Sequence, residues 1–243
     1  MLVIGGTDSS GGAGLTRDVA TLTHFGMEVL CAVTAVTAQT DAAVTAVRKL
    51  PPELVRAQIE AAMASGRISA VKIGMLADAA TVAAVSAALP PSDAAPLVLD
   101  PVLAASSGGE LLDAAGRATL CERLLPRTTL LTPNTVEAAT LLEATPATRE
   151  DEIIAQGRAL CARGARAVLM KGGHATGPLA IDWLVTVAGN VQSFIAPRLR
   201  VSRRGTGCTL ASAIAAGLAA GLSLVAACEQ AKRHVTEVLR HSV

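Results

Sequence analysis

Aromatic side chains are almost absent from this 243-residue chain: Phe25, Trp183 and Phe194 are the complete set, and there is no tyrosine. Platforms that stack the bases of single-stranded nucleic acid are built from aromatic side chains, so this composition speaks against one. The formal net charge is only +1 and the lysines and arginines are scattered, so no basic surface for nucleic acid or membrane lipid is predicted. Small molecules are the expected ligands.

Paired cysteines and a secretory signal are also lacking. The five cysteines are widely spaced and form no C-x-x-C pair: Cys31, Cys121, Cys161, Cys208 and Cys228. A reducing, cytoplasmic compartment is therefore expected.

One apolar stretch, residues 209–228, is long enough to cross a bilayer. It consists mostly of alanine and glycine, which are weakly hydrophobic, and a charged amphipathic sequence follows it. We favour a buried helix or helix pair, with a membrane protein as the alternative.

Hydrophobic residues make up 51% of the chain and charged residues 17%, which is enough apolar material for a core. Short apolar runs alternate with helix-like segments, and strands are expected at 2–6, 28–38, 70–75, 97–102, 130–133, 167–173 and 182–186. Continuous apolar strands separated by helices predict an α/β fold with a mainly parallel sheet between two helical layers. No linker-like run divides residues 1–243, so one domain is expected. Residues 179–197 form a predicted β-hairpin around Gly189.

In such sheets, ligands bind beyond the carboxyl ends of the strands. The segment GGTDSSGGAG (5–14) follows a strand there, and its glycines permit close approach of the backbone to a ligand. It matches neither a P-loop nor a dinucleotide fingerprint. A long turn without a ligand remains the alternative.

A second glycine segment, Gly205-Thr206-Gly207, opens a long alanine-rich helix. Successive backbone N–H groups and the helix dipole predict an anion hole for a transferring phosphoryl group. An ordinary glycine-containing helix start is the alternative.

Cys208 lies at the same helix start. We expect the helix dipole together with Arg203 and Arg204 to favour its thiolate, which makes Cys208 a candidate base beside a hydroxyl nucleophile. The other cysteines lie in strand or helix patterns and are interpreted as inert.

Three charged residues end apolar strands, where a charge must be solvated or paired. Asp100 and Lys171 are predicted to contact ATP or its phosphates at the ligand crevice. Lys72 is predicted to form a structural ion pair with a nearby carboxylate instead.

In TPNTVEAATLL (132–142), Asn134 is placed to cap a helix and Glu137 lies in its first turn. The same two side chains could instead bind phosphate and the water shell of Mg²⁺. The spacing leaves both interpretations open.

The motifs VIGGTDSSGGAGLTRD, TAVTAQT, VKIGML, LVLDPV, LLTPNTVEA, VLMKGGH and GTGCTLASAIAAGLA occur in this order. Together they resemble the bacterial hydroxymethylpyrimidine and phosphomethylpyrimidine kinases of the ribokinase-like superfamily. The resemblance implies ATP and Mg²⁺, phosphorylation of 4-amino-5-hydroxymethyl-2-methylpyrimidine and its monophosphate in thiamine biosynthesis, and a homodimer.

Residue by residue, the resemblance implies that Gln39 hydrogen-bonds the pyrimidine. The substrate pocket would be lined by Gly6, Asp18, Met75 and Val102. The GTGC run would be the anion hole, with Cys208 standing where sugar kinases carry an aspartate. Asn134 and Glu137 would serve phosphate and Mg²⁺, Glu137 through water, and Lys171 would lie beside the nucleotide.

Two positions depart from the family pattern: Ser106 replaces a common lysine, and Arg204 replaces a common histidine. Two alternatives stay open for the function. One is a pyridoxal kinase of the same superfamily, and the other is a pyrimidine-binding regulator without turnover.

Overall fold

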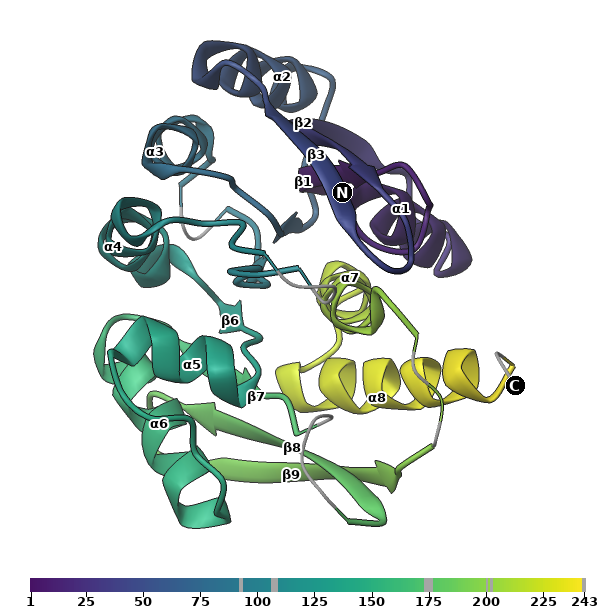
Figure 1. The fold of residues 1–243 in the computed structure, drawn as a ribbon, viewed down its shortest axis with the longest axis vertical. Helices are drawn as coiled ribbons and strands as arrows, with labels where there is room; N and C mark the ends of the chain where they lie inside the picture. The colour runs from purple at the N-terminus through teal and green to yellow at the C-terminus, as the bar shows by residue number, and fades with distance from the viewer. Residues whose placement is uncertain (92–93, 106–108, 173–176, 200, 202, 242–243) are drawn as a thin grey trace.

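The computed structural model describes residues 1–91, 94–105, 109–172, 177–199, 201 and 203–241. These residues form a nine-stranded sheet in the order β3-β2-β1-β4-β5-β6-β7-β8-β9, with helices on both faces (Figure 1). Strand alternation divides the core in two, because Leu2 and Ile4 face one helical layer and Val3 faces the other. The predicted three-layer α/β architecture is confirmed.

Six neighbouring strands are parallel, as the continuous apolar runs predicted: β2 (Leu30–Gln39), β1 (Leu2–Asp8), β4 (Val71–Ile73), β5 (Leu97–Leu99), β6 (Leu130–Leu131) and β7 (Ala167–Met170). The predicted hairpin is confirmed as β8 (Leu179–Thr186) and β9 (Val191–Pro197), which extend one edge antiparallel.

Strand β3 (Val44–Lys49), at the other edge, was not predicted. It pairs antiparallel with β2, but its residues are almost all exposed. Such a strand carries no apolar run for a sequence pattern to detect.

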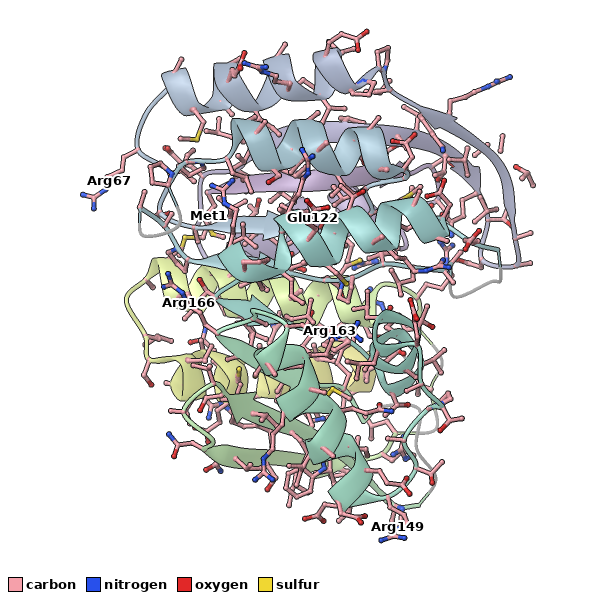
Figure 2. The ribbon with its side chains drawn as sticks, turned by 90° about the vertical axis from the view of Figure 1, so that its left-hand side faces the viewer. Met1, Arg67, Glu122, Arg149, Arg163 and Arg166 are labelled. Carbon is pink, nitrogen blue, oxygen red and sulfur yellow. The ribbon has the colours of Figure 1, made fainter. Side chains whose placement is uncertain are left out.

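One face of the sheet is covered by α2 (Pro52–Ala64), α3 (Ala79–Ala88), α4 (Ala114–Arg123), α5 (Thr135–Leu142) and α6 (Glu150–Ala162), with a short 3₁₀ turn η1 (Leu125–Arg127). Figure 2 looks onto this layer. The other face is covered by α1 (Gly14–His24), α7 (Thr206–Ala219) and α8 (Leu224–Arg240).

The apolar stretch 209–228 forms α7, a turn, and the first part of α8, so the predicted helix pair is confirmed. Nine successive residues of α7, 209–217, are buried. At its far end, a β-carbon on Gly217 would lie 3.0 Å from the Ala227 side chain, which explains why small residues are needed between the two helices. In the part of the chain that the structure covers, no helix is both long and apolar enough to cross a membrane.

Candidate active site

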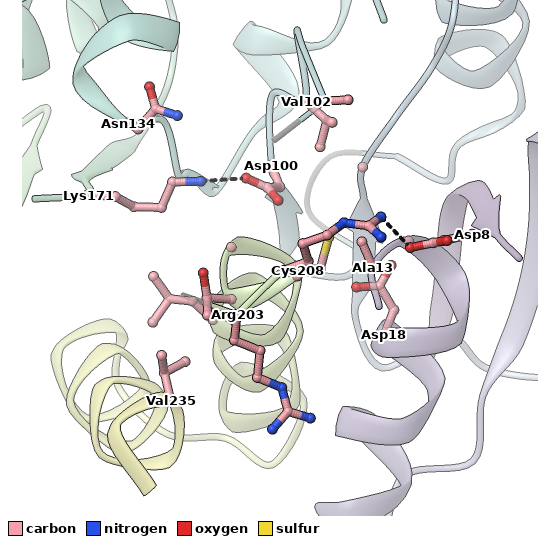
Figure 3. A pocket seen from close by; sticks show the side chains of 18 of the residues that line it. Asp8, Ala13, Asp18, Asp100, Val102, Asn134, Lys171, Arg203, Cys208 and Val235 are labelled. Atoms are coloured by element: carbon pink, nitrogen blue, oxygen red, sulfur yellow. Dashed lines mark hydrogen bonds and ion pairs between the residues drawn. The ribbon is translucent and has the colours of Figure 1, made fainter. Parts of the chain in front are cut away.

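A cavity of about 570 Å³ opens at the carboxyl ends of the parallel strands. Its wall contains every residue predicted for the site: Gly6, Asp18, Gln39, Met75, Asp100, Val102, Asn134, Glu137, Lys171, Gly205, Thr206, Gly207 and Cys208. Figure 3 shows several of them converging from β5, β7 and α7. Strand and helix ends distant in sequence therefore meet around one space.

The start of α7 depends on the backbone of Gly205. Its φ of +72° lies in the left-handed region, and a β-carbon there would collide with the carbonyl oxygen of Gly12. No side chain caps this helix start. The first amides of α7, at Thr206, Gly207 and Cys208, lack acceptors within the helix and border the cavity, which suits an anion.

Gly207 brings this turn against the charged end of β7. A β-carbon at Gly207 would lie 3.3 Å from Lys171 Nζ and 3.6 Å from Asp100 Oδ2. The amides of α7 and the ammonium of Lys171 therefore border the same part of the cavity. The helix start and the lysine therefore both contribute positive electrostatic potential to this part of the cavity.

Lys171 is held by carboxylates. Its Nζ lies 2.9 Å from Asp100 Oδ1, the contact drawn in Figure 3, and 3.6 Å from Glu137 Oε2. Burial alone would lower the pKa of Lys171, but the two carboxylates outweigh it and raise that pKa. Burial alone would raise the pKa of Asp100, but the ammonium groups of Lys171 and Lys72 hold it below its usual value. Lys171 is thus a permanent cation.

Asn134 and Glu137 form a capping box at the start of α5, as one of their two interpretations predicted. The Glu137 amide donates to Asn134 Oδ1 at 2.8 Å, and the Asn134 amide donates to Glu137 Oε2 at 2.7 Å. Burial raises the pKa of Glu137, although Lys171 opposes that shift. The box also lines the cavity, so the capping role does not exclude a ligand role.

The donor set around Lys171 suits a hard cation such as Mg²⁺, since it consists of carboxylate and amide oxygens. No group of three or more histidine, cysteine, aspartate or glutamate side chains that could hold a metal occurs within the described ranges. These residues therefore fit a Mg²⁺ that keeps waters and phosphate oxygens as most of its ligands.

The expectation for Cys208 is wrong in one respect. Burial raises the pKa of its thiol to about 11, although Lys72 partly opposes the shift. The two arginines expected to favour the thiolate are engaged elsewhere: Arg204 pairs with Asp8, and Arg203 points away from Cys208 and donates to the Val238 carbonyl (Figure 3). Cys208 is therefore a neutral thiol near pH 7.

Lys72 forms the predicted structural ion pair. Its Nζ lies 2.8 Å from each carboxylate oxygen of Asp18, and Ser212 Oγ donates to the same carboxylate at 2.8 Å. Both charged side chains are almost fully buried. Burial would lower the pKa of Lys72, but the charge of Asp18 raises it. Asp18 lines the cavity, yet its oxygens already have these two partners.

Another part of the cavity wall carries apolar side chains. Met75 packs with Val102 in a small cluster, and a β-carbon at Gly6 would lie 2.9 Å from Met75 Sδ. Gln39 ends β2 and accepts a hydrogen bond from Thr37 Oγ1 at 3.4 Å. A flat ring with a polar edge matches this combination of apolar walls and one side-chain amide.

Sequence reasoning missed two ion pairs of the cavity wall. Arg204 pairs with Asp8 across the chain, and Lys232 pairs with Asp182 at 2.7 Å. Asp182 was visible as a charge inside an apolar strand, but nothing in the sequence indicated its partner. Ser106, one of the departures from the family pattern, lies outside the described residues.

A crevice at the strand ends, an uncapped helix start and a buried lysine facing it define a phosphoryl-transferring enzyme of the ribokinase-like class. The phosphomethylpyrimidine kinase family model matches residues 8–243, and the chain belongs to that family. The predicted resemblance and kinase class are confirmed.

Relatives agree with this assignment. The chain is 45% identical to the hydroxymethylpyrimidine/phosphomethylpyrimidine kinase of Salmonella typhimurium over 216 residues, which cover 88% of this chain and 81% of that protein. The phosphomethylpyrimidine kinase of Clostridium difficile has a similar structure, with a TM-score of 0.84, 33% identity, and coverage of 98% and 97% of the two chains. A pyridoxal kinase from Staphylococcus aureus, in complex with AMP-PCP and pyridoxal, gives a TM-score of 0.88 at 27% identity, covering 98% and 86%.

Proposed function

We propose that this protein transfers the γ-phosphoryl group of ATP to hydroxymethylpyrimidine, and then a second one to the resulting monophosphate, in thiamine biosynthesis. The observation that carries the proposal is the placement of Gly207 beside Lys171 and Asp100, with Gln39 in the wall of the same cavity. A phosphoryl group bound at the first position would face a ring bound at the second.

The chain contributes position and charge more than covalent chemistry. The amides at the start of α7 stabilise negative charge on the transferring group, and Lys171 neutralises charge on the nucleotide side. The pocket of Gly6, Met75 and Val102 orients the ring so that the hydroxymethyl oxygen faces that group. The apolar walls exclude water, which would otherwise accept the phosphoryl group.

The proton of the hydroxymethyl group passes to Sγ of Cys208, in its thiolate form, late in the transfer. A pKa of about 11 leaves roughly one thiolate in ten thousand at pH 7. The positive charge of Lys72 favours this form. The proposed base is thus scarce at neutral pH, and the rate is expected to increase with pH.

Mg²⁺, when bound, would neutralise negative charge on the ATP phosphates. Glu137 would hold it through water, while Asn134 and Asp100 would orient that water and the phosphates. Lys171 and Lys72 hold the pKa of Asp100 below its usual value, so this carboxylate carries the negative charge that attracts a cation complexed with ATP.

A pyridoxal kinase is the second candidate. It is favoured by the TM-score of 0.88 to the Staphylococcus aureus pyridoxal kinase in complex with AMP-PCP and pyridoxal. The Gln39 amide, which can donate and accept at a ring edge, favours the aminopyrimidine.

We also propose that the chain works as a single-domain, cytoplasmic homodimer. Its five cysteines are all free, which suits a reducing compartment. The edge hairpin β2–β3 exposes Val36 and Val47, and such an edge is a candidate interface. Light scattering of the purified chain measures the mass directly, and a monomer at micromolar concentration would rule the dimer out.

The deciding experiment is mass spectrometry of products after incubation with Mg-ATP and, separately, hydroxymethylpyrimidine, its monophosphate or pyridoxal. Mono- and diphosphorylated pyrimidine support the proposal. Product from pyridoxal alone supports the second candidate. Pyrimidine binding without any product indicates a regulator that lacks turnover.

A further inference from the structure

Arg204 joins three segments that are far apart in the sequence. Its Nη2 lies 2.7 Å from Asp8 Oδ2, at the end of β1. Its Nη1 donates to the Thr40 carbonyl at 2.7 Å and to Ser10 Oγ at 3.1 Å. The third segment is the one that contains Arg204 itself, which immediately precedes Gly205 and the start of α7.

This arginine is not an ordinary surface cation. Its side chain is 12% exposed and that of Asp8 is 2% exposed. An ion pair withdrawn from water this far is screened little, and loss of one partner leaves the other charge buried. The second ion pair of Arg204, with Asp41, contributes little to stability, because the Asp41 carboxylate is 94% exposed and lies 3.4 Å away.

The same segments also hold Gln39. Ser9 Oγ accepts from the backbone N–H of Gln39 at 2.8 Å and donates to the backbone carbonyl of Gln39 at 3.0 Å. Gly205 packs so closely on Gly12 that no β-carbon fits between them. Residues 8–12, the end of β2 and the start of α7 are therefore connected by one set of contacts, with the guanidinium at its centre.

We propose that Arg204 is a positioning residue that fixes Gln39 relative to the amides of α7 and closes the acceptor end of the cavity to water. The inference rests on the proposed function, in which Gln39 binds the pyrimidine and those amides bind the phosphoryl group. Small errors in such spacing reduce transfer strongly. An open acceptor end would also admit water as a competing acceptor.

The kinetic test uses Arg204→Met, Asp8→Asn and the double variant. We expect KM for hydroxymethylpyrimidine to rise about tenfold or more in each, KM for ATP to change less than about twofold, and ATP hydrolysis without acceptor to increase. The double variant should resemble the single ones, because both break the same pair. Equal effects on both substrates would overturn the inference.

Arg163→Ala is the matched control. Arg163 also donates to backbone carbonyls, at 2.6 Å to Leu141, but it does not border the cavity. It should leave both KM values unchanged. Arg204→Lys keeps the positive charge and should restore part of the affinity for hydroxymethylpyrimidine. This variant also keeps the test possible if Arg204→Met does not fold.

A second readout does not depend on activity. Hydrogen–deuterium exchange without substrates should increase in residues 8–12 and 39–43 of Arg204→Met, and not in α6. Unchanged exchange in both segments would overturn the inference. A wild-type protein that makes no phosphorylated pyrimidine would refute the proposed function, while the exchange result would still decide whether Arg204 ties these segments together.

Discussion

Gly207 and Lys171 are neighbours in the cavity wall, so close that a β-carbon at residue 207 would lie 3.3 Å from the ammonium nitrogen. The contact joins the start of α7 to the end of β7, two elements that meet at the strand ends. In the proposed function, the amides and the ammonium would therefore act on the same bound group. The ammonium can be removed by substitution of Lys171, which leaves the amides in place.

Lys171→Met should reduce kcat/KM with Mg-ATP by about a hundredfold or more, since it removes a preorganised positive charge beside the transferring group. Steady-state kinetics at saturating acceptor measures this. Lys49→Met is the control, because Lys49 pairs with Asp78 on the exposed surface. Similar losses in both variants would show that the effect is not specific to the cavity.

The role of Cys208 predicts a pH dependence. If its thiolate accepts the proton, kcat/KM should rise about tenfold per pH unit over the range in which the protein is stable, because the pKa of the thiol is about 11. Cys208→Asp should flatten this dependence, since the ordinary pKa of an aspartate lies far below that of a thiol. Cys208→Ala should lower kcat far more than pyrimidine affinity. A flat wild-type profile would refute the base role.

The buried pair of Lys72 and Asp18 predicts a stability effect. Lys72→Met leaves an unpaired carboxylate in the core and should lower the free energy of unfolding by about 3–5 kcal/mol. Ser212→Ala, which removes one hydrogen bond to Asp18, should cost about 1 kcal/mol. Urea titration followed by circular dichroism measures both. A loss in Lys72→Met as small as that of the surface variant Lys49→Met would contradict the prediction.

The ring stack between α1 and α8 predicts acid sensitivity. His24 and His234 have ring centroids 4.7 Å apart, and burial, followed by repulsion from His24, lowers the pKa of His234, although Glu237 opposes the shift. The unfolded chain therefore binds the proton more readily than the folded one. This contribution to stability is present above pH 6.5 and is lost as the pH falls through 6.5 toward the lower folded-state pKa.

The melting temperature should accordingly be lower at pH 5.5 than at pH 7.5, and His234→Phe should reduce the difference. His241→Asn, at the exposed end of α8, should leave it unchanged. An equal pH dependence in wild type and His234→Phe would rule out this stack as the cause.

Continuous apolar runs predicted the parallel strands because such strands are covered on both faces. A lysine interpreted as ending an apolar strand likewise predicted a structural ion pair, and Lys72 has a buried one. Strand β3 escaped prediction because exposed edge residues need no apolar pattern. The protonation of Cys208 and the pairing of Arg204 with Asp8 escaped it for another reason: both depend on side-chain direction and on contacts between residues far apart in the sequence.

The burial of α7 has a consequence for how substrate preference can change. Residues 209–217 are all buried, so few substitutions are tolerated in the helix that presents the amides proposed to bind the phosphoryl group. Gln39 and Met75, by contrast, lie at the ends of strands or just beyond them. Evolution can therefore exchange one hydroxymethyl-bearing ring for another at the acceptor end while the phosphoryl-binding half stays constant.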